Sequence, residues 1–370
     1  MKKVYFDSVA TTSLNPEVSK TYKKLLDEYY CNSDALYDDG VAIYRMMETS
    51  RKNIANMLKV DEREVIFTSG ASEANSMAIK GLCLNQTKRK HIITSVYEHS
   101  SAHNAIKQLE ENFGFEVDYL MPDANGVIDP QKVKEKLRSD TILVSIMFVN
   151  NEIGAINDID EIGRIVKLNS GTYFHSDLTQ GIGKLDFSLK NIDLACFSAH
   201  KLHGLKGSGI LVKKQHVNLL PLINGGQQEF GIRGGTSNAL VNICFAKTLR
   251  IALENKDKYK DYIHSLNEYF INEAEKISGL KINNVGIDSL INLSTPVKSE
   301  VMLNALNLRG IMVSSKSTCS SREHGTNRAL SAIGVDEDYA IRVSFDYSNT
   351  REEIDYFMEC IKEAIKEYGA

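Results

Sequence analysis

The stretch TILVSIMFVN, residues 141–150, decides the fold class of this 370-residue chain. Its run ILVSIMFV, residues 142–149, shows no alternation of polar and apolar residues. Such a run is typical of a strand that is buried on both faces, as in a parallel sheet covered by helices. We therefore expect this segment to be a central strand that marks the middle of a sheet.

Further short β-rich runs flank this stretch, and the first few are each followed by an amphipathic segment. They are EVIFTSG (64–70), HIITSVYEH (91–99), FEVDYLM (115–121), TYFHSD (172–177), LACFSAHK (194–201) and GILVKK (209–214). Strands that alternate with helical patterns predict a mostly parallel sheet covered by helices. The fold class expected is therefore α/β.

The two ends of the chain show other patterns. NPEVSKTYKKLLDEYY, residues 15–30, predicts a helix capped by Asn15 with Pro16 at its first position. After residue 237, long charged helices precede the strands LINLS, IMVSS and AIRVSF and a closing helix over 350–368. We expect a large domain over 14–250 and a smaller α/β domain formed by 1–13 and 251–370.

The bulk properties favour an enzyme of small molecules. A formal net charge of −4 gives no reason to expect a duplex nucleic acid or an anionic membrane as the main partner. The apolar run near Met1 is too short for a signal peptide, and no segment is long enough to span a bilayer, so we expect a cytoplasmic protein. Six cysteines without CxxC spacing indicate neither a zinc site nor a disulfide framework.

Lys201 is the most informative single residue. It ends an apolar run in FSAHKLHGLKGSG, residues 197–209, and is flanked by Ser198, His200 and a glycine-rich turn. A desolvated lysine has a lowered pKa, which frees its amine to form a Schiff base with an aldehyde cofactor. Taken alone, such a residue is more often a lysine at a sheet edge whose amine extends to water.

Polar residues follow a neighbouring strand as well. Asp177 ends TYFHSD, and Gln180 stands three positions later. Because the carboxyl ends of parallel strands face one crevice, Asp177 can pair with a protonated pyridine nitrogen there, and Gln180 can bond a ring hydroxyl. An isolated Asp after a strand is otherwise more often a loop cap.

Two further segments are weaker signals. In IFTSGASEAN the amides of Ala71 and Ser72 can meet a phosphate at a helix N-terminus, although many turns between a strand and a helix contain Gly and Ser. In YEHSS, His99 follows a strand and could stack on a planar ring and move protons, or be only a polar strand end. Neither a Walker lysine nor a GxGxxG pattern is present, which argues against nucleotide binding.

Cys319 stands apart from the other cysteines. It lies in the serine-rich stretch VSSKSTCSSREHGTN, residues 313–327, close to Lys316, Arg322 and His324. Basic neighbours favour the thiolate, which is the nucleophilic form of cysteine. The alternative is an inert exposed thiol. The other five cysteines stand in helical or strand-like surroundings and are expected to pack as small hydrophobes.

In this order, the motifs resemble those of the cysteine desulfurases of the class V aminotransferase family, in the NifS/IscS-like group with a long cysteine-bearing loop. The resemblance covers nearly the whole chain. Its motifs here are YFDSVATT, TSGASEAN, YEHSS, VNNEIGAI, HSDLTQGIGKL, FSAHKLHGLKGSG, GGQQEFGIRGGTSN, VSSKSTCSS and IRVSF followed by NTREEID. It implies a type I fold of enzymes that use pyridoxal 5'-phosphate (PLP), with a seven-stranded, mostly parallel sheet.

The resemblance also implies a role for each matching residue. Lys201 would carry PLP, with Asp177 at the pyridine nitrogen and Gln180 at the ring oxygen. His99 would stack on the ring and move the substrate thiol's proton. The phosphate would lie among Ser198, His200, Ala71 and Ser72, and Thr236 would reach the phosphate of the neighbouring subunit in a homodimer. Asn151 would lie beside cofactor and substrate, and Arg342 would bind the substrate carboxylate.

The implied reaction converts L-cysteine to L-alanine and leaves the sulfur on Cys319 as a persulfide. An acceptor protein would then take it, either an iron–sulfur scaffold or a tRNA-thiolation protein. Two alternatives stay open, namely another PLP reaction, such as selenocysteine lysis or transamination, and a non-catalytic scaffold.

The chain departs from the family pattern at several positions. The usual motif DNAATTP is DSVATTS here, so Ser8, Val9 and Ser13 replace an asparagine, an alanine and a proline. Tyr37 replaces a histidine, and Phe230 replaces an arginine. In the cysteine loop, Lys316 and Thr318 change SGSAC to SKSTC. None of these departures removes a residue with an implied catalytic role.

Overall fold

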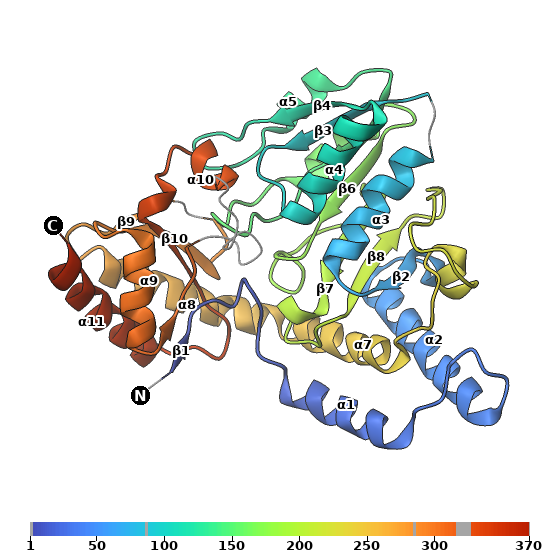
Figure 1. Ribbon diagram of the computed structural model, residues 1–370, viewed down its shortest axis with the longest axis horizontal. Coiled ribbons are helices and arrows are strands. Elements are labelled where there is room, and N and C mark those ends of the chain that lie inside the picture. Colours follow the sequence, from blue (N-terminus) through green and yellow to red (C-terminus); the bar gives the residue numbers. More distant parts are fainter. Residues whose placement is uncertain (1–2, 86–87, 284–285, 316–326, 370) are drawn as a thin grey trace.

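A seven-stranded sheet forms the centre of the computed structural model, which describes residues 3–85, 88–283, 286–315 and 327–369 (Figure 1). Its strands lie in the order β2-β8-β7-β6-β5-β3-β4 and are parallel except for β8, which is antiparallel to both neighbours. The bounds are β2 (Val65–Thr68), β3 (His91–Ser95), β4 (Glu116–Leu120), β5 (Thr141–Ser145), β6 (Tyr173–Asp177), β7 (Leu194–Ser198) and β8 (Gly209–Lys213). The predicted α/β fold with a mostly parallel sheet is confirmed.

Helices cover both faces of this sheet. In the described ranges the α-helices are α1 (Pro16–Glu28), α2 (Asp38–Leu58), α3 (Ala71–Leu84), α4 (Ser100–Phe113), α5 (Pro130–Lys136), α6 (Ile159–Val166), α7 (Ala239–Glu254), α8 (Lys256–Ala274), α9 (Ser299–Leu308), α10 (Arg328–Ala332) and α11 (Arg351–Tyr368). Short 3₁₀ helices are η1 (Glu62–Glu64), η2 (Ala199–Lys201), η3 (Gln228–Gly231) and η4 (Glu337–Tyr339).

Strand β7 shows how the two faces are filled. Leu194 and Cys196 belong to the apolar cluster formed with α3 and α4, whereas Ala195 and Phe197 belong to the cluster formed with α2, α6 and α7. Successive side chains of a strand point to opposite faces, so each strand contributes to both clusters. Burial on both faces explains the uninterrupted apolar runs in the sequence.

The predicted central strand lies one place from the centre. β5 pairs with β3 and β6, and β6 holds the middle position of the seven. The strand also ends at Ser145, although the apolar run continues to Val149. Residues 146–149 are buried at the carboxyl end of the sheet, where Met147 and Val149 line a cavity described below.

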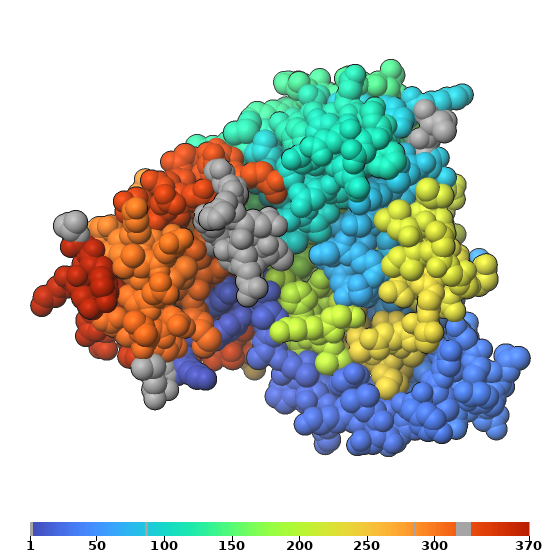
Figure 2. Space-filling model, viewed as in Figure 1, coloured from blue at the N-terminus to red at the C-terminus, as the bar shows by residue number. Residues whose placement is uncertain are grey.

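The C-terminal part has its own sheet and core, and it lies beside the larger sheet in Figures 1 and 2. Its three strands have the order β12-β10-β9, and a separate parallel pair joins β1 to β11. The bounds are β1 (Val4–Tyr5), β9 (Lys281–Ile282), β10 (Leu290–Ser294), β11 (Ile311–Met312) and β12 (Ala340–Ser344). The N-terminal strand thus packs with residues more than 300 positions later. The division at residue 250, inside α7, stays a prediction.

The early helix begins where it was predicted to begin. α1 starts at Pro16, and the Asn15 side chain accepts a hydrogen bond from the Glu17 amide at 2.9 Å. The amides of the first helical turn have no partner within the helix. Pro16 has no such amide, and the Asn15 side chain accepts a hydrogen bond from one of them. Among the helices of the described ranges, none combines the length and apolar composition needed to cross a bilayer.

Candidate active site

A cavity of about 220 Å³ lies at the carboxyl end of the seven-stranded sheet. Ten of the predicted site residues line it, namely Ala71, Ser72, His99, Asn151, Asp177, Gln180, Ser198, His200, Lys201 and Arg342. Nine come from the carboxyl ends of strands of the large sheet or from the segments that follow these ends, and Arg342 comes from β12. The topology therefore brings together side chains that are up to 271 positions apart in the sequence.

Two predicted site residues are not part of this cavity lining. Thr236 is exposed, in the segment between η3 and α7. Cys319 lies outside the described residues, as do Lys316 and Thr318. The roles of Thr236 and Cys319 therefore stay predictions.

Lys201 ends the 3₁₀ helix η2, directly after β7. Its amine donates hydrogen bonds to the backbone carbonyls of Val9 at 2.5 Å and Ala10 at 2.6 Å. These acceptors belong to the N-terminal segment that follows β1. A chain segment more than 190 residues away thus holds the lysine amine at the cavity.

Asp177 is the last residue of β6 and is 5% exposed. Its Oδ1 accepts from the Thr179 amide at 2.9 Å, and its Oδ2 accepts from Asn75 Nδ2 at 2.7 Å. Each oxygen of this carboxylate thus accepts one hydrogen bond from a neutral donor. The aspartate is therefore built to face a positive charge in the cavity.

Gln180 has a defined amide orientation. Its Oε1 accepts from the Lys184 amine at 3.3 Å, while its Nε2 donates to the Val9 carbonyl at 3.1 Å. Burial lowers the pKa of Lys184 to about 8, and Asp346 opposes this shift. Because Lys184 occupies the oxygen, Gln180 presents its amide nitrogen to a ligand.

His99 caps α4 and exposes one ring nitrogen to ligands. Its Nδ1 accepts from the Ser101 amide at 3.2 Å and lies 2.8 Å from Ser101 Oγ. Burial lowers the pKa of His99, and the Asp177 carboxylate opposes that shift. The neutral ring with an acceptor at Nδ1 carries its proton on Nε2.

The N-terminus of α3 forms the end of the cavity nearest Ser72. The Ala71 amide donates to Ser198 Oγ at 2.8 Å, and Gly70 precedes it as a cap without a side chain. Gly209 is required beside this turn because a Cβ there would lie 2.5 Å from the Gly70 backbone. A helix N-terminus flanked by serine hydroxyls is suited to an anion.

His200 lies next to this helix terminus and is neutral at pH 7. Burial lowers its pKa to about 4, and the charge of Lys201 adds to the shift. Its Nδ1 lies 3.1 Å from Thr11 Oγ1. His200 can therefore serve an anion as a hydrogen-bond donor through Nε2 and contributes no full charge.

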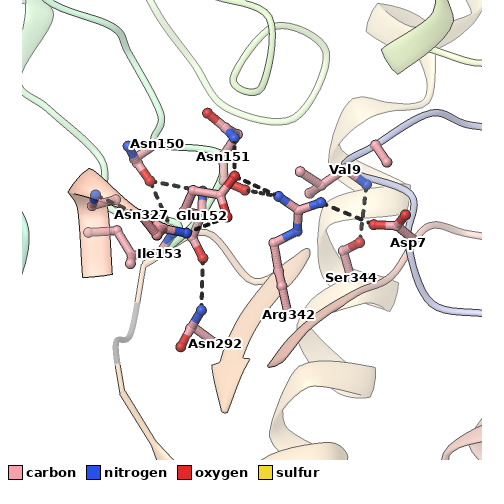
Figure 3. A network of polar contacts seen from close by, with 12 residues as sticks. Asp7, Val9, Asn150, Asn151, Glu152, Ile153, Asn292, Asn327, Arg342 and Ser344 are labelled. Carbon is pink, nitrogen blue, oxygen red and sulfur yellow. Dashed lines mark hydrogen bonds and ion pairs between the residues drawn. The ribbon is translucent and has the colours of Figure 1, made fainter. Parts of the chain in front are cut away.

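Arg342 is 1% exposed and lies between two carboxylates, as Figure 3 shows. Its Nη1 donates to the Asn151 carbonyl at 2.8 Å and to Glu152 Oε1 at 3.0 Å, and its Nη2 donates to Asp7 Oδ1 at 3.1 Å. Within the described residues its Nε is buried without a hydrogen-bond partner.

The two carboxylates around Arg342 are themselves perturbed. Burial raises the pKa of Asp7 and of Glu152, and Arg342 opposes both shifts. Glu152 also accepts from the Asn151 side chain at 2.6 Å and from Asn327 Nδ2 at 3.2 Å. The single positive charge of Arg342 is therefore already shared by two acids when no ligand carboxylate is bound.

The structure identifies site residues to which sequence reasoning gave no role. Asp7 lies in YFDSVATT, and Glu152 lies in VNNEIGAI. In each motif, a carboxylate close to apolar residues is the sequence signal that could have identified it. Asn75 and Ser101 lie in the first turns of α3 and α4, and only the fold shows that they contact Asp177 and His99. Thr179 lines the cavity, and its buried Oγ1 has no hydrogen-bond partner in the described part of the chain.

Together these residues define the chemistry that the cavity can accept. An anion fits at α3, a protonated ring nitrogen at Asp177, a carbonyl carbon at Lys201 and a carboxylate at Arg342. The donors and acceptors that line the cavity thus supply one partner for each of these four groups. The site therefore fits PLP together with an amino acid.

Comparisons with known proteins agree with this chemistry. Residues 4–357 match the family model described as Aminotransferase class-V. The chain is 38% identical to "Cysteine desulfurase IscS" of Dictyoglomus turgidum, over 99% of this chain and 95% of that protein. A solved structure titled "NIFS-LIKE PROTEIN" has a TM-score of 0.93 and 33% identity, covering 99% of this chain and 100% of the other. Another, "SspA in complex with cysteine", has a TM-score of 0.82 and 31% identity, over 93% and 99% of the two chains.

The match extends over nearly the full length of each of these proteins, and the cavity residues fit the cofactor of the family. The chain therefore belongs to the class V aminotransferases, and within them to the PLP-dependent cysteine desulfurases of the IscS and NifS type.

Proposed function

We propose that this protein converts L-cysteine to L-alanine and receives the sulfur on Cys319 as a persulfide. The observation that carries the proposal is the convergence of Lys201, Asp177, His99 and Arg342 on one cavity. The similar structure described as bound to cysteine supports the substrate. In the reaction the C–S bond of cysteine breaks and an S–S bond forms with the Cys319 thiolate, while the substrate carbon gains a proton to give alanine. No external oxidant is needed.

The cofactor would lie with its phosphate at Ala71, Ser72, Ser198 and His200, its ring nitrogen at Asp177 and its ring oxygen at Gln180. Bound in this way, PLP supplies an electron sink for the charge that develops at the substrate α-carbon. His99 would stack on its ring.

The side chains of this chain supply the remaining steps. The Lys201 amine takes the α-proton of the substrate, and Arg342 and Asn151 hold the substrate in place. His99 is neutral in the resting arrangement, so its ring can take up the substrate thiol proton as an imidazolium and release a proton from Nε2 later in the reaction. The Cys319 thiolate then attacks the substrate sulfur.

The active form would be a homodimer. An open groove of about 720 Å³ runs between α3 and α4 and includes Ser72 and His99 in its walls. The exposed Thr236 of a second copy would enter this groove and reach the phosphate. Sedimentation velocity tests the dimer, and Thr236→Ala is expected to weaken PLP binding without changing the fold.

The acceptor of the sulfur would be an iron–sulfur scaffold or a tRNA-thiolation protein. We also propose a cytoplasmic location and a domain division at residue 250.

The test is a comparison of wild type, Lys201→Ala, Cys319→Ala and the control Cys31→Ala, each incubated with L-cysteine and a thiol reductant. We expect wild type and Cys31→Ala to release equal amounts of alanine and sulfide. Lys201→Ala should release neither, and Cys319→Ala should lose sulfide release and the persulfide seen by peptide mass spectrometry. Full activity of Cys319→Ala would favour another PLP reaction, and failure of wild type to bind PLP would favour a scaffold.

A further inference from the structure

Asn75 is a buried residue of α3 with 0% exposure, and its amide contacts three side chains on two other elements, β6 and α4. Its Nδ2 donates to Asp177 Oδ2 at 2.7 Å and to Ser101 Oγ at 2.9 Å. Its Oδ1 lies 3.1 Å from His175 Nε2. Both N–H groups of this amide and its oxygen are therefore engaged.

The orientation of this amide follows from the chemistry of its partners. A carboxylate only accepts hydrogen bonds, so the Asn75 nitrogen must face Asp177 and its oxygen must face His175. His175 Nε2 then carries a proton, and its Nδ1 accepts from the Ser145 hydroxyl at 2.9 Å. Burial lowers the pKa of His175 to about 4, so the ring is neutral at pH 7.

The second N–H of Asn75 leads to the other side of the cavity. Because Ser101 Oγ accepts this N–H, its own hydroxyl proton is left for His99 Nδ1 at 2.8 Å. The Ser101 amide points at the same nitrogen. Both donors keep the His99 proton on Nε2, the nitrogen available to a ligand.

We infer that Asn75 is a positioning residue that holds Asp177 and His99 in one arrangement through a single amide. One N–H sets the carboxylate that faces the cofactor ring nitrogen, and the other sets the hydroxyl that orients His99. Asn75 touches neither cofactor nor substrate, since it is absent from the cavity lining. The His99 part of this inference rests on the proposed function, whereas the Asp177 part concerns cofactor binding alone.

Two variants separate the two N–H bonds. Asn75→Ala removes both, and it leaves Asp177 with the Thr179 amide as the donor described above. Ser101→Ala removes the hydroxyl that links Asn75 to His99 and leaves the bond from Asn75 to Asp177 in place. Asn75→Asp keeps the size of the side chain but places a second carboxylate where the donor was, so repulsion is added to the loss.

The first measurement is the dissociation constant of PLP and the pH titration of its visible absorption in the reconstituted protein. A hydrogen bond to a charged group predicts about tenfold weaker binding for Asn75→Ala, and more for Asn75→Asp. Ser101→Ala should stay within about twofold of wild type. The second measurement is the pH profile of kcat with L-cysteine, which both Asn75→Ala and Ser101→Ala should alter.

Asn85→Ala is the matched control, because Asn85 is an exposed asparagine at the far end of α3 whose amide donates to the Asn218 carbonyl. It should bind PLP as wild type does. If Asn75→Ala does not fold, Asn75→Ser carries the same measurement. Equal PLP affinities for Asn75→Ala and Asn85→Ala would overturn the inference, and so would equal weakening by Ser101→Ala. A wild type that binds PLP but makes no alanine would refute the proposed function and leave the cofactor test intact.

Discussion

Two buried charged residues face the cavity from opposite sides, and their surroundings differ. Asp177 is surrounded by neutral donors from the large sheet and α3, whereas Arg342 is held between the acids Asp7 and Glu152. The first set belongs to the large sheet and its turns, and the second joins the N-terminus, the β5–α6 connection and β12. If Asp177 loses one neutral donor, the other donor remains. If Arg342 is removed, two buried acids lose their cationic partner together.

The largest effect is expected from Arg342→Ala. Two buried carboxylates would then face each other without a cation, which costs about 3–5 kcal/mol of unfolding free energy. Both have folded pKa values above their unfolded values of about 4, so the stability of the variant should fall as pH rises and recover on acidification. Urea unfolding at pH 5 and pH 8 measures this.

Arg309→Ala is the control for that variant. Arg309 also contacts two glutamates, Glu363 and Glu367, but these lie at the surface. A surface pair contributes about 0–1 kcal/mol, so this loss should be small and almost independent of pH. If both variants lose the same unfolding free energy, the buried ion pairs of Arg342 contribute no more to stability than the surface pairs of Arg309.

A smaller effect is expected on the Asp177 side from Ser145→Ala. This change leaves the His175 Nδ1 without its hydroxyl partner, at a cost of about 1–3 kcal/mol for a buried unsatisfied group. The exposed Ser170 gives the control Ser170→Ala, expected within about 0.5 kcal/mol of wild type. Because His175 is neutral, the loss should be the same at pH 6 and pH 8, unlike that of Arg342→Ala.

The smallest effect is expected from Asp7→Asn, which keeps an acceptor for Arg342 but removes one negative charge. L-Alanine, the proposed product, should bind this variant more tightly than wild type once both acids of the wild type are ionised. The ratio of the two dissociation constants cancels the titration of the ligand amine. The ratio of the wild-type to the variant constant should increase with pH by up to about tenfold, the equivalent of one pKa unit, because burial raises the pKa of Asp7 and its carboxyl group loses its proton as pH rises. A ratio that does not change with pH would show that the Asp7 charge does not oppose the ligand carboxylate.

The same contrast explains what could be predicted from the sequence. Lys201, Asp177 and His99 directly follow strands of the large sheet, and the carboxyl ends of parallel strands share one edge, so their convergence followed from the pattern. Asn75 and Asp177 are 102 positions apart, and Arg342 and Asp7 are 335 apart. Such pairs depend on how helices and sheets pack, which local spacing does not specify.

The carbonyl groups of Val9 and Ala10 have a consequence for how this chain can diverge. Lys201 and Gln180 are held there by main-chain oxygen atoms, which every residue type supplies. The side chains of this segment can therefore change, as Ser8 and Val9 differ from the family pattern, while its carbonyl groups still accept hydrogen bonds from the Lys201 amine. Saturation mutagenesis at Val9 and Ala10 should find that many residue types keep the enzyme active. Insertions or deletions there should abolish activity, because they would move the two carbonyl groups away from Lys201.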